Sequence, residues 1–159
     1  MDEKAANNDV INRLVTELGD ETDVVRKSAC AALEKMDEKA ATDDVINKLV
    51  TALGDENYDV RWSAYAALRT MGEKAATNDV INSLVTVALG DENKDVSLGA
   101  CKALEKMGEK AATNDVLNKL VTALGDENKE VRVSACEALN KGAKAADNDV
   151  INRLVTAND

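Results

Sequence analysis

A unit of about 35 residues recurs along the whole of this sequence, and it constrains the fold more than any other feature. Three consecutive copies occupy residues 36–70, 71–106 and 107–141; residues 1–35 form an earlier copy, and residues 142–159 begin a fifth. A unit of this length cannot bury its own apolar face, so neighbouring copies must stack and share one continuous core. The repeat therefore predicts a single elongated domain that includes the whole chain.

The first half of each copy has the pattern of an amphipathic helix. In the second copy the apolar residues recur at the spacing of a single helical stripe: Val45, Ile46, Leu49, Val50 and Leu53. Thr42 precedes this stripe with a hydroxyl that can cap the first free amides, and Gly54 follows it, as is typical of a helix end. The residues after that glycine, Asp-Glu-Asn, favour a tight turn.

The second half of each copy predicts another helix, which starts near Asp59 in the second copy. Its inward-facing residues again have helical spacing: Val60, Ala64, Ala67, Leu68 and Met71. Helix pairs with identical stripes stack side by side, so the sequence predicts an all-α fold. The expected architecture is a right-handed α-solenoid of about four helix-pair repeats, closed by one C-terminal capping helix in residues 142–159.

The turn and the second helix together follow a pattern of Leu, Asp, Val-Arg, Ala and Ala-Leu. In the second copy this pattern falls on Leu53, Asp55, Val60, Arg61, Ala64, Ala67 and Leu68. Its Asp-Val-Arg part recurs as Asp20/Val25/Arg26, Asp91/Val96/Ser97 and Asp126/Val131/Arg132. The pattern resembles that of HEAT-like helical repeats, of the HEAT and armadillo type, over essentially the whole chain. The third copy departs from it, because Ser97 stands where the other copies have arginine.

The resemblance implies a ladder of ion pairs, in which the aspartate of one repeat meets the arginine of the next repeat along the stack. A guanidinium suits this role because it can bridge a carboxylate and turn carbonyls at once. The predicted ladder consists of Asp20, Asp55, Asp91 and Asp126 with Arg26, Arg61 and Arg132. Ser97 interrupts it, so we expect the third repeat to be its weak or bent point. The same repeat has an extra residue, Val87, which we interpret as a neutral irregularity; a π-bulge or a shifted register is the alternative.

Several kinds of chemistry are missing from the sequence. It has no histidine, which removes the usual general base and most zinc sites, and it has no glycine-rich phosphate loop. Cys30, Cys101 and Cys136 occupy one repeat position, and repeats stacked about 8–10 Å apart lie beyond disulfide reach. We interpret these cysteines as half-buried packing residues. The sequence predicts no catalytic residue, no metal site and no cofactor.

The charge of the chain narrows the class of partner. Thirty acidic residues against twenty basic ones give a net charge of −10, which disfavours nucleic acids and anionic membrane surfaces. A basic protein or peptide is compatible with this charge. The sequence shows neither a signal-peptide pattern nor an apolar run long enough to span a membrane, so a cytoplasmic location is expected by default.

Positions that differ between the copies are free of the demands of stacking and therefore indicate where a binding surface would lie. Three such positions share one face of the second helix, at i, i+4 and i+7 spacing. They carry Asp23, Tyr58, Lys94 and Lys129 at the first, Lys27, Trp62, Leu98 and Val133 at the second, and Cys30, Tyr65, Cys101 and Cys136 at the third. In the HEAT-like family the second helices line the concave surface, which implies a groove there. The candidate partner-binding residues are Tyr58, Trp62, Tyr65, Leu98 and Val133.

The function expected from this surface is that of a non-enzymatic scaffold which binds a protein or a peptide. All aromatic residues of the chain lie between Tyr58 and Tyr65, and exposed Tyr and Trp side chains often anchor a partner. Trp62 could instead pack over the next repeat. A structural or self-assembling module is the main alternative, as a homo-oligomer, a fragment of a longer array or an engineered scaffold; an enzyme of the HEAT-like lyase type is the least favoured.

Overall fold

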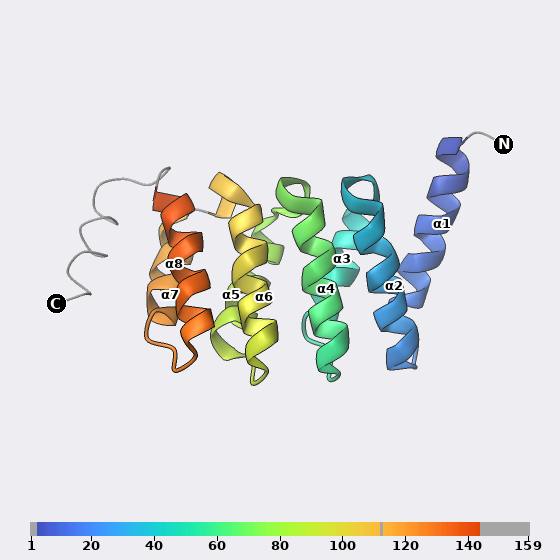
Figure 1. Cartoon of the computed structure of the whole chain (residues 1–159). Helices are drawn as coiled ribbons and strands as arrows, with labels where there is room; N and C mark the ends of the chain where they lie inside the picture. Colours follow the sequence, from blue (N-terminus) through green and yellow to red (C-terminus); the bar gives the residue numbers. More distant parts are fainter. Residues whose placement is uncertain (1–2, 112, 144–159) are drawn as a thin grey trace.

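The computed structural model describes residues 3–111 and 113–143, which form a row of paired helices (Figure 1). Eight α-helices lie within these residues: α1 (Glu3–Glu17), α2 (Asp23–Met36), α3 (Asp43–Ala52), α4 (Tyr58–Met71), α5 (Asn78–Gly90), α6 (Lys94–Lys106), α7 (Asn114–Ala123) and α8 (Lys129–Ala143). A short 3-10 turn follows each of the second helices α2, α4 and α6, at Asp37–Ala40, Gly72–Ala75 and Gly108–Ala111.

The helices form two layers. The second helices α2, α4, α6 and α8 stand side by side in front, and α3, α5 and α7 lie behind them (Figure 1). Each second helix packs against the next one, and the first helices contact one another less extensively. The chain is therefore an all-α solenoid of four helix pairs, as the repeat predicts. The capping helix was predicted in residues 142–159; residues 142 and 143 belong to α8, and residues 144–159 are outside the described residues.

Helix starts recur at equivalent positions because each copy repeats the same capping residues. A threonine hydroxyl begins each of three first helices and accepts a hydrogen bond from the backbone N–H three residues on: Thr42, Thr77 and Thr113. An asparagine begins each of three second helices, where its side-chain oxygen accepts from the backbone N–H two residues on: Asn57, Asn93 and Asn128. These caps set the helices of successive copies to the same register, which lets their faces match.

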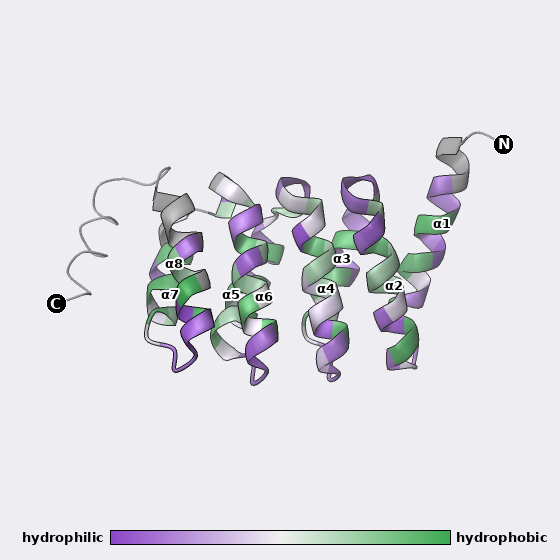
Figure 2. Ribbon diagram, viewed as in Figure 1, coloured by the Kyte–Doolittle hydropathy of each residue, from purple (hydrophilic) through white to green (hydrophobic). Residues whose placement is uncertain are grey.

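The core lies between the two layers. The apolar stripes predicted from the sequence are buried there, with Val45, Leu49, Val60 and Leu68 fully covered. Polar residues gather on the turns at the lower edge of the row (Figure 2). The sequence pattern thus decides which side of each helix faces the core and which faces water.

The extra residue Val87 lengthens helix α5. In α3 the chain leaves the helix in a tight turn, where the N–H of Asp55 donates to the carbonyl of Ala52 at 3.2 Å. In α5 the N–H of Asp91 donates to the carbonyl of Val87 at 3.0 Å, which continues the four-residue spacing of an α-helix. The π-bulge considered from the sequence is therefore wrong: the described residues contain no π-helical segment.

This longer helix changes which residues fill the core. Continuous helical spacing places Ala88 where α3 has Leu53, and both side chains are buried. Leu89 is displaced to an exposed position. The third repeat therefore replaces a large core side chain by a methyl group and puts a leucine at the surface.

Candidate functional site

Four of the five residues predicted to bind a partner are accessible on the second-helix face. Tyr58 is 53% exposed, Trp62 is 40% exposed, Val133 is also exposed, and Leu98 is partly buried. Tyr65 is different: only 4% of its surface is exposed. The prediction that Tyr65 offers its side chain to a partner therefore needs correction, because the ring is enclosed between neighbouring helices.

The buried ring of Tyr65 packs against the ring of Trp62. The two rings meet edge to face, with centroids 4.5 Å apart and planes at 88°. Such a contact is worth about 0.5–1.5 kcal/mol beyond the area that it buries. Burial raises the pKa of the Tyr65 hydroxyl to about 12, so the ring stays neutral at physiological pH. The buried tyrosine thus holds the exposed tryptophan in a defined orientation.

Room for the Tyr65 ring comes from Gly99 in the neighbouring helix α6. A Cβ atom built on Gly99 would lie 2.2 Å from the ring, so no larger residue fits there without movement. The other copies have serine at this position, Ser28, Ser63 and Ser134, and cysteine at the position of the ring. The large side chain of Tyr65 in the second repeat is therefore matched by the small residue Gly99 in the third. Comparison of the copies could have found this pair, since both differ from their repeat consensus.

A pocket of about 300 Å³ opens beside Trp62. Side chains from three successive second helices line it: Glu34, Trp62, Ser63, Tyr65, Ala66, Arg69 and Lys102. Arg69 approaches the carboxylate of Glu34 at 3.8 Å, and Lys102 is exposed. The pocket thus combines one indole face with charged groups that remain in contact with water, which suits a mixed apolar and polar side chain.

Ion pairs join the first three repeats, but the predicted direction of the ladder is wrong: the arginine of one repeat meets the aspartate of the next. Arg26 donates two hydrogen bonds to the carboxylate of Asp55, from Nε at 2.7 Å and from Nη2 at 3.0 Å. Its Nη1 donates to the turn carbonyls of Asp20 and Glu21. Arg61 makes the same contacts one repeat later, with Asp91 and with the carbonyls of Asp55 and Glu56. Each guanidinium therefore holds its own turn and the next repeat together.

The carboxylate of Asp55 carries opposing influences. Burial favours its neutral form, but the hydrogen bonds from Arg26 and from the backbone N–H of Asn57 outweigh burial and lower the pKa of Asp55 below its ordinary value. The ion pair therefore remains charged at neutral pH.

The third repeat replaces its missing arginine with a neighbouring lysine. The hydroxyl of Ser97 donates to the carbonyl of Asp91 at 3.2 Å, which reproduces only the turn contact of the arginine. Lys94 supplies the charge, because its Nζ lies 3.4 Å from Oδ2 of Asp126. In the fourth repeat, Nη1 of Arg132 again donates to its own turn carbonyls, those of Asp126 and Glu127.

The cysteines do not form a common site. Cys30 and Cys101 are fully buried, and burial raises their pKa to about 12 and about 11, so both thiols are protonated and unreactive at neutral pH. Cys136 is exposed. Among the residues that the structure describes, no group of three or more metal-binding side chains comes together.

Family comparison agrees with this geometry. The sequence profile of HEAT repeats matches residues 11–87, 46–140 and 81–159, and the chain belongs to this family. Proteins of this fold are typically scaffolds rather than catalysts. A search of curated proteins found no match. Over the described part of the chain, no helix combines the length and the apolar character needed to cross a membrane.

Solved structures share the solenoid. An engineered protein from the Northeast Structural Genomics Consortium superposes with a TM-score of 0.75 at 22% identity, over 93% of this chain and 68% of that one. A designed armadillo repeat protein in complex with the peptide (KR)4 has a TM-score of 0.75 at 20% identity, over 98% of this chain and 73% of that one. At these identities the likeness shows the fold alone.

Proposed function

We propose that this protein is a non-enzymatic scaffold that binds an extended segment of a protein or peptide across its second-helix face. The observation that carries the proposal is Trp62, which is exposed although its ring packs against Tyr65, a buried residue that is itself seated on Gly99. An exposed aromatic ring with a fixed orientation costs little entropy on binding, which is the property of an interface anchor.

The elements beside Trp62 extend this surface along the row. Tyr58 lies one helical turn before Trp62 in α4, next to the acidic loop that precedes this helix. Leu98 in α6 and Val133 in α8 occupy the position equivalent to Trp62. A segment lying across α4, α6 and α8 would therefore meet apolar side chains at regular intervals. The pocket between Trp62 and Lys102 would accept one of its side chains.

The partner that we propose is basic. The protein has a net charge of −10, and the exposed carboxylates of Glu56 and Glu92 lie on the turns next to Tyr58 and Lys94. Such a field raises the rate at which cations meet the surface, and the effect weakens with added salt. The designed armadillo protein whose structure contains the peptide (KR)4 supports the idea that this fold can accept a basic peptide.

Selection from a random peptide library, followed by titration of the selected peptides, tests the proposal. Trp62 is the only tryptophan, so its fluorescence reports binding to the original protein. The anisotropy of a fluorescently labelled peptide reports binding to both the original protein and the variant that lacks Trp62. We expect enrichment of basic peptides with an apolar residue, and a loss of affinity of at least about tenfold in Trp62→Ala together with Tyr58→Ala.

Thr51→Ala provides the matched control, because Thr51 is exposed on α3 in the other layer. It should leave the affinity unchanged. Selected peptides that bind the double variant as tightly as the original protein would contradict the proposed surface.

A further inference from the structure

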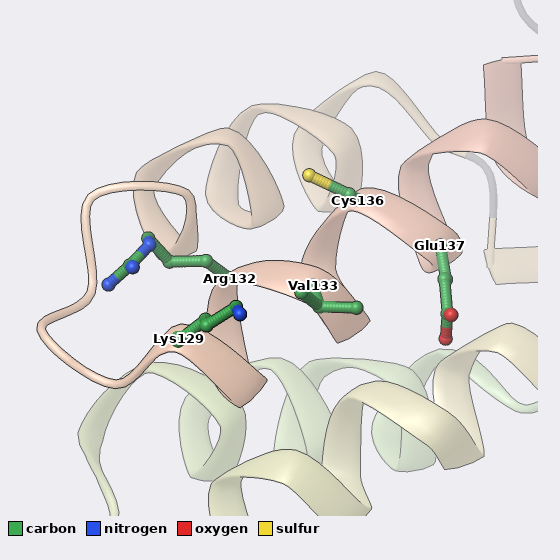
Figure 3. A pocket seen from close by; sticks show the side chains of 5 residues that line it. All are labelled: Lys129, Arg132, Val133, Cys136 and Glu137. Atoms are coloured by element: carbon green, nitrogen blue, oxygen red, sulfur yellow. The ribbon is translucent and has the colours of Figure 1, made fainter.

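The last described second helix, α8, has a stacking face that no other described helix covers. A pocket of about 460 Å³ lies on it, lined by Lys129, Arg132, Val133, Cys136 and Glu137 (Figure 3). The equivalent face of α4 is covered by α6, and that of α6 is covered by α8. Burial of the cysteine position shows the difference: Cys101 on α6 is fully buried, whereas Cys136 is exposed.

The first repeat has the complementary face. Within the described residues no guanidinium reaches the carboxylate of Asp20, whereas Asp55 and Asp91 each accept two hydrogen bonds from an arginine of the preceding repeat. On α2, Val24 is 66% exposed and Ser28 is also exposed. The equivalents of Ser28, which are Ser63 and Gly99, are covered by the preceding second helix, and Asp59, the equivalent of Val24, is partly covered.

The contacts inside the solenoid show which residues of two stacked repeats meet. Arg26 contacts Asp55, Lys27 lies 3.1 Å from Asp59, and Tyr65 packs on Gly99. Applied once more at the open ends, the same register brings Arg132 to Asp20, Val133 to Val24 and Cys136 to Ser28 of another molecule. Arg132 and Asp20 would then form the same ion pair as Arg26 and Asp55. Val133 and Val24, both exposed, would meet at the position where Lys27 and Asp59 form an ion pair.

We propose that copies of this protein associate head to tail, with the α8 face of one copy stacked on the α2 face of the next. Charge and apolar surface both match in this arrangement, and it continues the interface that already joins the repeats. Because the two faces are different, the contact does not close on itself and leads to open chains of copies.

Sedimentation velocity over a dilution series at low salt tests the proposal. We expect the average mass to rise with concentration beyond that of a dimer. Val133→Lys alone and Val24→Asp alone should each weaken association about tenfold, since each puts an unpaired charge against a valine. The two changes together should restore it, because they recreate the pair of Lys27 and Asp59.

Thr51→Lys is the matched control, since it adds the same charge at an exposed position of α3, and circular dichroism verifies that every variant folds. A mass that stays monomeric at all concentrations would overturn the proposal. So would a mass that never exceeds two copies, which indicates a symmetric contact, or equal weakening by Val133→Lys and Thr51→Lys.

Discussion

The ion pairs between successive repeats differ along the solenoid. Between the second and third repeats, Arg61 and Asp91 form a paired contact whose side chains are 11% and 7% exposed. Between the third and fourth repeats, Lys94 is 47% exposed and reaches Asp126 with one contact at 3.4 Å. Both joints nevertheless bury an extensive helix–helix interface.

The difference teaches that apolar packing holds the repeats together and that the ion pair adds strength where it is shielded from water. A nearly buried bidentate pair depends on both partners, because either charge alone would be left desolvated. An exposed lysine pair contributes little, since water and salt screen it. The third repeat tolerates Ser97 because the surrounding helices stack without its arginine.

The largest expected effect is the loss of the shielded pair. Arg61→Met should lower the free energy of unfolding by about 3 kcal/mol, because Asp91 loses its partner in a largely buried place. Lys94→Met, at the exposed joint, should cost less than about 1 kcal/mol. Urea unfolding monitored by circular dichroism compares the two variants; equal losses would mean that the joints do not differ in the way described.

The second effect concerns the fit of Tyr65 against Gly99. Gly99→Ser introduces the residue of the other copies and should cost about 2 kcal/mol, because its Cβ collides with the ring. Tyr65→Cys in the same chain should recover most of this loss by restoring the Cys and Ser combination. Thermal unfolding of the two single variants and the double variant measures the coupling.

Gly90→Ala is the control for that series. No heavy atom lies within 4 Å of a Cβ built on Gly90, which ends helix α5. Stability should stay the same or rise by up to about 1 kcal/mol, since alanine favours a helix. A large loss at Gly90 would show that glycine is needed for the backbone rather than for space.

A smaller effect is expected from removal of Val87. The deletion should let α5 end as α3 does and return Leu89 to the buried place that Ala88 now fills. Stability should rise by about 1 kcal/mol, because the burial of a leucine side chain outweighs the packing that the half-buried Val87 provides. Leu89→Ala should change stability by less than about 0.5 kcal/mol because Leu89 is exposed. Destabilisation by the deletion would show that the longer helix is the better packed one.

The smallest effect is a dependence on acid. The folded pKa of Asp55 lies below its unfolded value, so its contribution to stability is complete at neutral pH and is lost as the pH falls below about 4. Asp55→Asn should therefore reduce the slope of stability against pH in this range, as measured by urea unfolding at several pH values. An unchanged slope would assign the acid sensitivity to other carboxylates.

The sequence predicted much of the fold from its repetition. The cap at Thr42, the stripe through Leu49 and the end of the first helix near Gly54 follow from spacing within one copy, where contacts are local. The repetition and the family resemblance predicted which residues form the ion pairs, but not the direction of the pairing, since Arg26 and Arg61 each meet the aspartate of the following repeat. The ion pair of Lys94 with Asp126, which takes the place of the missing arginine, was not predicted. It depends on how far the lysine side chain extends from the third repeat to the fourth.

The candidate surface was only partly predictable. Comparison of the copies indicated which positions are variable, and Tyr58 and Trp62 are indeed at the surface. The same comparison could not separate Trp62 from Tyr65, since both lie on the same side of one helix. The position of α6 decides between them, and Gly99 determines how deeply the ring of Tyr65 can enter.

The sequence by itself therefore determined the number of described helix pairs, the apolar and polar sides of each helix, and the residues that face the core. These features depend on periodicity along one helix. Only the tertiary structure decided that Tyr65 is buried, that Lys94 pairs with Asp126 and that α5 absorbs Val87 by lengthening. The first two outcomes depend on the space between helices whose contacting residues are more than thirty positions apart in the chain, and a periodic pattern does not specify that space.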